Sequence, residues 1–285
     1  MQKIHVDFIG KDPEYKEEKP WFDELCVESS GTKIFGTVLI PGREKGDPVD
    51  TRPCAILLHG YPGHTVTFDI GQALRRTGIV SVNFSYRGCW GSEGTYTISG
   101  LVEDAIHVAE WIKQDDIAKK YRIDVNNIFL IGHSMGGYTA INAGRKLPWI
   151  KGIGVMSPYD LPWFIENHQE EKLNELIDSG LYVLNAKQDM IGDDLKKCVA
   201  LGYGFSHAQD DLKNRNLLLV GAERDDIAPA SEMIEPLWNC LQTYQTDAIQ
   251  EYIIIDANHP FDDKRLTVSK MFAEWIKRVI ESEGS

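Results

Sequence analysis

A serine set between glycines is the strongest chemical signal in the sequence. Residues 132–136 read Gly-His-Ser-Met-Gly, and they stand between an apolar run at 127–131 and a helical pattern at 135–146. In this strand–turn–helix setting, a G-x-S-x-G motif places its serine on a sharp, strained turn. The hydroxyl then projects at the positive end of the helix. We therefore predict that Ser134 is a nucleophile.

A serine nucleophile needs a base, and one of the eight histidines stands in the expected place. His259 follows the last predicted strand and precedes the last predicted helix, and a parallel sheet presents its functional groups in such loops. Three other histidines are weaker choices. His107 lies inside a helical pattern, His133 is expected to point away from the serine, and His207 lies in a later insertion. We predict that His259 is the base.

The acid that orients the base should follow the strand before it. Residues 217–220 form that strand, and Asp225 and Asp226 both lie in the loop after it. The chain order serine, aspartate, histidine differs from the orders in trypsin and subtilisin. Glu223 is a poorer third choice, and Asp160, which follows an earlier strand, is the remaining alternative.

An oxyanion hole requires two backbone N–H groups that are fixed before the reaction. The residue after the nucleophile, Met135, is placed to supply one of them. The first predicted parallel strand ends in His-Gly-Tyr-Pro-Gly at residues 59–63, where Tyr61 is placed to supply the other. Pro62 has no N–H and cannot do so.

The elements that position these residues are buried strands alternating with helices. Runs that are apolar on both faces are typical of parallel strands covered on both sides, and strands that alternate with helices indicate a parallel sheet between helical layers. Before them, runs at 25–30 and 33–40 flank a glycine and predict an antiparallel hairpin. The apolar runs are residues 54–58, 79–84, 127–131, 152–156, 217–220 and 252–255.

One interval breaks the alternation. Residues 158–213 hold helix-like patches, several aromatic residues and, between 160 and 211, eleven acidic residues against four lysines. Because a structureless loop of this length is rare in a compact domain, we predict a helical cap insertion. The core would then comprise residues 25–157 and 214–285, after a lead-in at 1–24. Trp163 and Phe164 of the cap are the predicted substrate-binding residues.

Composition excludes several classes of function. The 285 residues include 30 Lys and Arg against 43 Asp and Glu, a formal net charge of −13. An acidic surface repels phosphates, so no nucleic-acid partner is expected. No apolar run approaches the roughly 20 residues of a membrane span, so no membrane partner is expected either. The five scattered cysteines contain no C-x-x-C pair and predict neither a disulfide framework nor a metal site, which favours a cytoplasmic protein.

Taken together, these motifs resemble those of the α/β-hydrolase superfamily over roughly residues 33–280. The resemblance rests on residues 59–63, 132–137, 221–229 and 258–261. It implies an α/β-hydrolase fold: a mostly parallel sheet flanked by helices, with the N-terminal hairpin and the cap insertion. Residues 86–94 resemble the R-G-x-G-x-S-x-G loop of that superfamily, but they depart from it by lacking an acid just before the arginine.

The same resemblance implies a set of site residues. Ser134 would be the nucleophile, His259 the base, and Tyr61 and Met135 the oxyanion donors. In the Gly-x-x-x-Asp-x-x-x-Pro arrangement of the superfamily, Asp225 takes the place of the acid better than Asp226 does.

The motifs are most similar to those of cinnamoyl- or feruloyl-type carboxylesterases and of prolyl-oligopeptidase-like catalytic domains. That similarity implies a serine hydrolase whose partner is a small-molecule ester, cleaved through an acyl-enzyme with no cofactor and no metal. The alternative is a small peptidase, amidase or thioesterase that uses the same triad. A more remote alternative is a non-catalytic ligand-binding protein of the same fold.

Overall fold

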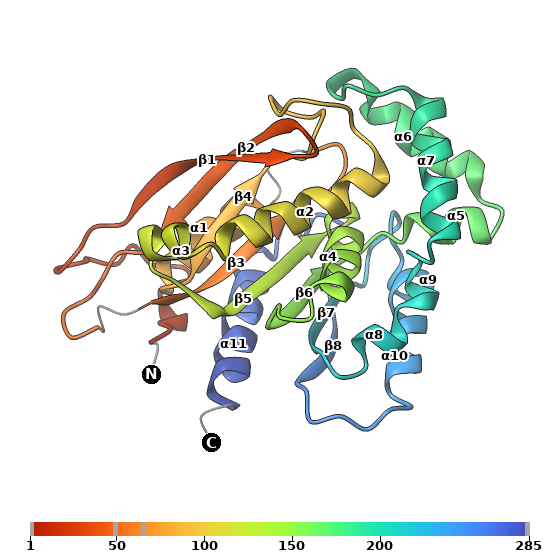
Figure 1. The fold of residues 1–285 in the computed structure, drawn as a ribbon. Helices are drawn as coiled ribbons and strands as arrows, with labels where there is room; N and C mark the ends of the chain where they lie inside the picture. Colours follow the sequence, from red (N-terminus) through yellow and green to blue (C-terminus); the bar gives the residue numbers. More distant parts are fainter. Residues whose placement is uncertain (1–2, 48–50, 64–66, 283–285) are drawn as a thin grey trace.

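The backbone forms one eight-stranded sheet in the order β1-β2-β4-β3-β5-β6-β7-β8 (Figure 1). The computed structural model describes residues 3–47, 51–63 and 67–282. Those parts of the predicted lead-in and core that fall at 1–2, 48–50, 64–66 and 283–285 lie outside the described residues.

The N-terminal hairpin is present as predicted. β1 (Trp21–Ser29) pairs antiparallel with β2 (Thr32–Ile40). Ser30 and Gly31 between them both have positive φ, 50° and 80°, which suits the tight turn of a two-residue hairpin. β2 joins the remaining sheet by antiparallel pairing with β4 (Val80–Phe84).

The other strands all run parallel, which confirms the predicted fold class. Successive side chains of a strand point to opposite faces. In β3, Ile56 therefore packs in one apolar cluster and Leu57 in the other. Both faces are covered, and this is why these strands are continuously apolar in sequence. The strands are β3 (Arg52–Leu58), β5 (Ile123–His133), β6 (Gly152–Met156), β7 (Asn216–Ala222) and β8 (Gln250–Ile255).

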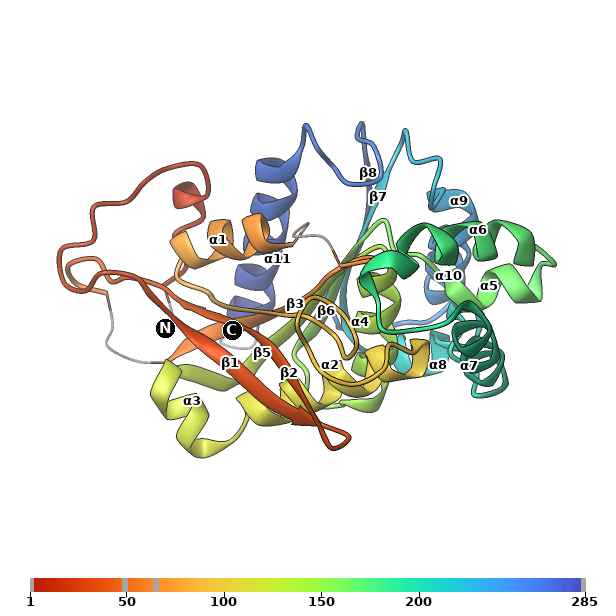
Figure 2. The ribbon, with the colours of Figure 1, turned by 90° about the horizontal axis from the view of Figure 1, so that it is seen from above.

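Helices cover the two faces unequally (Figure 2). α1 (Phe68–Arg76) and α11 (Arg265–Ser282) lie together on one face. The opposite face is covered by α2 (Ile98–Ile112), α3 (Asp115–Tyr121) and α4 (Met135–Lys146).

Helices also fill the interval between β6 and β7, where the sequence predicts a cap. Their apolar residues belong to the same cluster as the α2 and α4 face of the sheet, with Leu173, Ile177 and Leu195 among them. The segment is therefore packed continuously with the core, while its boundaries at 158 and 213 stay a prediction. The helices are α5 (Leu161–Glu166), α6 (Glu170–Gly180), α7 (Gln188–Ala200) and α8 (Gln209–Leu212). After β7 come α9 (Ala230–Met233) and α10 (Glu235–Leu241).

Polar contacts fasten this helical segment to the core at two places. The Asp194 carboxylate of α7 accepts hydrogen bonds from the N–H and the hydroxyl of Ser99, at 2.7 and 2.9 Å, at the start of α2. The Arg145 guanidinium of α4 donates to the carbonyls of Gly202 and His207, at 2.8 and 3.0 Å. These bonds hold the middle of α7, and the chain that follows its last residue, against the core helices.

Candidate active site

Ser134 stands on a strained turn between β5 and α4. Its φ of 55° and ψ of −125° lie outside the conformations that non-glycine residues ordinarily adopt. The glycines on either side have no room for a side chain. A Cβ on Gly132 would lie 2.1 Å from the Gly136 carbonyl oxygen, and one on Gly136 would lie 1.9 Å from that of Leu58. The turn therefore needs both glycines.

Hydrogen bonds link Ser134 to His259, and His259 to Asp225. His259 Nε2 lies 3.0 Å from Ser134 Oγ, and His259 Nδ1 lies 2.8 and 3.0 Å from the two carboxylate oxygens of Asp225. All three residues are buried. The fold thus brings together, in contact, the three residues that the sequence nominated as nucleophile, base and acid.

The loop after β7 also explains how Asp225 keeps its charge. Its Oδ1 accepts the backbone N–H groups of Ile227 and Ala228 at 3.0 and 2.8 Å. Burial alone would raise the pKa of Asp225, but the hydrogen bonds from His259 and Ala228 outweigh it and lower the pKa below its ordinary value. An ionised carboxylate facing Nδ1 holds the imidazole with its other nitrogen toward the serine.

The competing carboxylates lie elsewhere. Asp226 is exposed to solvent. Asp160 is buried at the start of α5, where its Oδ2 accepts the N–H of Phe205 at 2.9 Å, and burial raises its pKa to about 8. Within the described part of the chain, only Asp225 contacts His259 through a carboxylate.

The two residues nominated as oxyanion donors flank the serine. Met135 is the first residue of α4. Tyr61 lies in the loop after β3, which passes close to the serine, because a Cβ on Gly60 would lie 3.1 Å from Ser134 Cβ. Within residues 3–47, 51–63 and 67–282, the backbone N–H groups of Tyr61 and Met135 do not donate to a backbone carbonyl.

His133 is a site contact that sequence reasoning missed. Its Nε2 lies 2.9 Å from the backbone carbonyl oxygen of His259, and the two rings are 4.9 Å apart. Burial, assisted by the neighbouring His259, lowers the pKa of His133 to about 3. The ring is therefore neutral, and because a carbonyl only accepts, its proton sits on Nε2. The only signal in the sequence was its place beside the serine.

The two predicted substrate-binding aromatics occupy different environments. Phe164 is buried, and its ring stacks on that of Tyr159 with centroids 4.7 Å apart. Trp163 is half-buried and lines a cavity of about 390 Å³ between α5 and α10, together with Phe205 and Leu237. Among the described residues neither ring is paired with the imidazole of His259. One link to the nucleophile candidate is the Tyr159 N–H, which donates to its backbone carbonyl at 3.0 Å.

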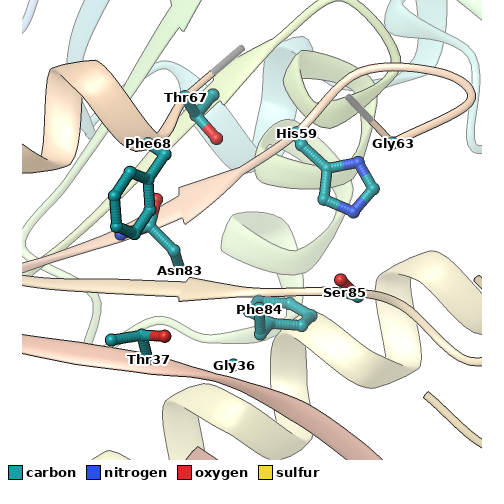
Figure 3. A pocket seen from close by; sticks show the side chains of 9 residues that line it. All are labelled: Gly36, Thr37, His59, Gly63, Thr67, Phe68, Asn83, Phe84 and Ser85. Carbon is teal, nitrogen blue, oxygen red and sulfur yellow. The ribbon is translucent and has the colours of Figure 1, made fainter. Parts of the chain in front are cut away.

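A second cavity, of about 170 Å³, opens beside the loop after β3 (Figure 3). His59 and Gly63 of that loop line it, together with Phe68 at the start of α1 and Asn83 of β4. Ser134 is absent from its lining among the residues that the structure describes. The cavity therefore adjoins the loop after β3 without reaching the nucleophile candidate.

In the loop at residues 86–94, Arg87 forms ion pairs with two acidic residues of α2. Arg87 Nε lies 2.6 Å from Asp104 Oδ1, and Arg87 Nη2 lies 2.6 Å from Glu103 Oε2. Asp104 is fully buried and also accepts the Arg87 backbone N–H at 2.7 Å. The acidic partner of Arg87 is therefore Asp104 of α2, since no acidic residue stands just before Arg87.

Two structural features are absent from the described residues. No group of three or more His, Cys, Asp or Glu side chains is arranged there to hold a metal ion. None of the helices described has both the length and the apolar character needed to cross a membrane.

Comparison with known proteins places the chain in a family. A family model described as "Alpha/beta hydrolase family" matches residues 55–230. The chain belongs to the alpha/beta hydrolase family. Its matched relatives include the lysophosphatidylserine lipase ABHD12 of Bos taurus, 34% identical over 102 residues, which are 34% of this chain and 23% of that protein. An abhydrolase domain-containing protein of Dictyostelium discoideum is 26% identical over 156 residues, half of this chain and 38% of the relative. This hydrolase therefore matches only about a quarter to two fifths of the length of these relatives.

Solved structures of similar fold include esterases. Est1E from Butyrivibrio proteoclasticus, solved with ferulic acid bound, superposes with a TM-score of 0.65 at 17% identity, over 90% of this hydrolase and 99% of Est1E. The esterase Est22 gives a TM-score of 0.65 at 17% identity, over 91% of this chain and 82% of Est22. At these identities the likeness concerns the fold alone.

Proposed function

We propose that this alpha/beta hydrolase is a serine hydrolase that cleaves a carboxylic ester of modest size through an acyl-enzyme intermediate. The observation that carries the proposal is the unbroken chain of hydrogen bonds from Ser134 Oγ through the imidazole of His259 to the Asp225 carboxylate. A hydroxyl is a weak nucleophile by itself, and this arrangement gives it a base that a charged carboxylate orients.

In the acylation step, His259 Nε2 takes the proton of Ser134 Oγ as the oxygen attacks the ester carbonyl carbon. The carbonyl oxygen becomes an oxyanion that the N–H groups of Tyr61 and Met135 stabilise. Collapse of the tetrahedral intermediate breaks the bond to the alcohol oxygen, to which His259 returns the proton. In the second half, His259 deprotonates a water molecule, which attacks the acyl carbon and releases the acid and Ser134. Asp225 stays ionised throughout and stabilises the imidazolium.

The relatives support an ester as substrate. Two solved structures of similar fold are esterases, and the matched ABHD12 proteins are lysophosphatidylserine lipases. An amidase, peptidase or thioesterase would use the same triad, since these enzymes differ in pocket and leaving group. A non-catalytic binding protein would have no need for the strained serine or for the ionised carboxylate behind the base.

We also propose that Trp163 contributes to substrate binding. Its support is the position of Trp163 on the cavity between α5 and α10, next to the loop whose Tyr159 N–H is bonded to the backbone of Ser134. Phe164 lies edge-on to Trp163, with ring centroids 5.0 Å apart, and supports the indole from inside.

A substrate panel combined with covalent labelling tests the proposed function. The wild-type protein is assayed with p-nitrophenyl esters of increasing acyl length, with acyl-CoAs and with aminoacyl anilides. A fluorophosphonate is then mapped by peptide mass spectrometry. We expect the highest kcat/KM with esters and a single adduct on Ser134. Turnover confined to anilides or thioesters would reassign the leaving group.

Matched serine variants complete the test. Ser134→Ala should lower kcat by several orders of magnitude with unchanged thermal unfolding, as removal of a triad serine does. Ser282→Ala removes an exposed hydroxyl at the end of α11 and should retain wild-type turnover. Absence of both ester turnover and labelling in the wild-type protein would overturn the proposed function.

A further inference from the structure

The two proposed oxyanion donors belong to different elements. Tyr61 lies in the loop after β3, and Met135 begins α4. A pair of N–H groups stabilises an oxyanion only when both are held within hydrogen-bond distance of one oxygen position. Some contact must therefore fix the loop relative to the helix. The inference that follows rests on the proposed function.

One buried side chain touches both donors. Tyr96 is 1% exposed and lies just before α2. Its O–H donates to the sulfur of Met135 at 2.8 Å. Its ring also meets that of Tyr61 edge to face, with centroids 6.1 Å apart and planes at 67°. Tyr96 thus bridges the side chains of the two residues whose backbones flank Ser134.

The helical segment between β6 and β7 holds this bridge in place. The Tyr61 O–H donates to the backbone carbonyl of Ile177 in α6. Gly180, which ends α6, is pressed against the same ring, because a Cβ there would lie 2.4 Å from Tyr61 Cε1. The Tyr96 N–H donates to the carbonyl of Asn185 at 3.1 Å. Both tyrosines are therefore anchored to residues 177–185.

We propose that Tyr96 is a positioning residue that sets the spacing between the backbone N–H groups of Tyr61 and Met135, and that residues 177–185 hold it in that position. A thioether is a weak hydrogen-bond acceptor, so loss of the Tyr96–Met135 bond has a small effect on folding. Loss of the spacing has a larger effect on rate, because misplacement of catalytic groups by about 1 Å can lower a rate by about a hundredfold.

Two conservative variants break the bridge from its two sides. Tyr96→Phe removes the hydroxyl and keeps the ring against Tyr61, while Met135→Leu removes the sulfur and keeps an apolar side chain. With the best ester, each should lower kcat roughly tenfold and change KM less than twofold. Each should weaken inhibition by an aliphatic trifluoromethyl ketone, whose adduct with Ser134 carries an oxyanion, by a similar factor. The double variant should be no slower than the slower single variant, because both remove one contact.

A second tyrosine provides the control. Tyr121 is also buried, and its O–H donates to Asp23 Oδ2 at 3.1 Å. It lies just before the start of β5, whereas Ser134 follows the opposite end of that strand. Tyr121→Phe should leave kcat and the inhibition constant unchanged, even where its melting temperature falls.

Three outcomes are distinguishable. Single variants with kcat within twofold of wild type, or a double variant whose losses multiply, would show that Tyr96 acts only in packing. If Tyr96→Phe does not fold, the kcat of Met135→Leu by itself decides between a positioning role and a packing role for Tyr96. A wild-type protein with neither ester turnover nor fluorophosphonate labelling would remove the proposed function, and the role of Tyr96 with it.

Discussion

At the scale of single residues, the site depends on a carboxylate that stays charged while buried. Asp225 does so because the N–H groups of Ile227 and Ala228, as well as His259, reach its oxygens. Its pKa is lower in the folded chain than in the unfolded chain. The resulting stabilisation is present above the unfolded pKa and is lost as the pH falls through the folded pKa. Its neighbour in sequence, Asp226, is exposed to solvent.

Asp225→Asn and Asp226→Asn form a matched pair for this point. The first variant keeps the volume but presents an amide to His259 Nδ1, so the tautomer reverses and kcat should fall by about 10⁴. The second changes an exposed side chain and should leave kcat within twofold. Steady-state kinetics with the best ester measure both. A crippling effect of Asp226→Asn would move the acid to the other carboxylate.

His133 carries the second prediction at this scale, because its Nε2–H holds the backbone of His259. His133→Leu removes the donor and should lower kcat roughly tenfold, because the base is then misplaced. His133→Gln retains an amide N–H donor and should keep most of the wild-type kcat. Equal kcat in the two variants would contradict a role for the hydrogen bond.

The same residue gives a stability readout that depends on pH. The pKa of His133 is about 3 in the folded chain against 6.5 ordinarily. Between these values the unfolded chain binds a proton that the folded chain does not, so the wild-type protein loses stability as the pH falls. Urea unfolding at pH 7 and pH 4.5 should show a smaller loss for His133→Gln.

At the scale of elements, Asp160 joins the two ends of the helical segment between β6 and β7. It immediately precedes α5 and accepts the N–H of Phe205, which lies 45 residues further along the chain. Burial raises the pKa of Asp160 to about 8, far above the ordinary 3.8. Between those values the folded chain binds a proton that the unfolded chain releases. The wild-type protein therefore loses stability as the pH rises from about 4 to about 8.

Asp160→Asn should relieve this loss. An asparagine keeps an oxygen for the N–H of Phe205 and does not titrate, so the variant should gain stability relative to wild type as the pH rises, by roughly 4 kcal/mol between pH 4.5 and pH 8. Thermal and urea unfolding at pH 4.5, 6.5 and 8 measure the trend. The exposed Asp226→Asn serves as the control. A constant or falling difference for Asp160→Asn would show that its carboxyl group is ionised in the fold.

At the scale of the whole molecule, the helical segment between β6 and β7 belongs to the main apolar cluster. Phe164 and Ile177 pack there together with sheet residues such as Leu130. An insertion that only covered a site would have a separate cluster of its own. The structure therefore assigns the segment a share in stability as well as a place beside the site.

Trp163→Ala and Phe164→Ala should separate these two contributions. Phe164 is buried, so its truncation should cost about 3–5 kcal/mol of unfolding free energy, as much as a core change such as Leu130→Ala. Trp163 lines a cavity, so its truncation should cost less and should change kcat/KM unequally across a series of acyl lengths. Denaturant unfolding and the ester series test the pair. Equal stability losses, with uniform effects on all esters, would contradict the division.

The sequence by itself determined the features that depend on local geometry. The glycines around Ser134 admit only a tight strand–turn–helix connection, and the doubly apolar runs require a sheet covered on both faces. The chain order of Ser134, Asp225 and His259 followed from the strands that precede each of them. Alternating strands and helices also predicted the parallel sheet, because a parallel connection needs a crossover that a helix supplies.

Only the tertiary structure decided the contacts between segments that are distant along the chain. It separated Asp225 from Asp226 by showing which carboxylate meets His259, and it placed His133 against the backbone of His259. It also joined Tyr61 to Met135 through Tyr96. Such contacts depend on how helices and loops pack across the sheet. The residues adjacent in sequence do not predict that packing. Periodicity gives the face on which a side chain lies, but its partner on that face is fixed only when all the elements are in place.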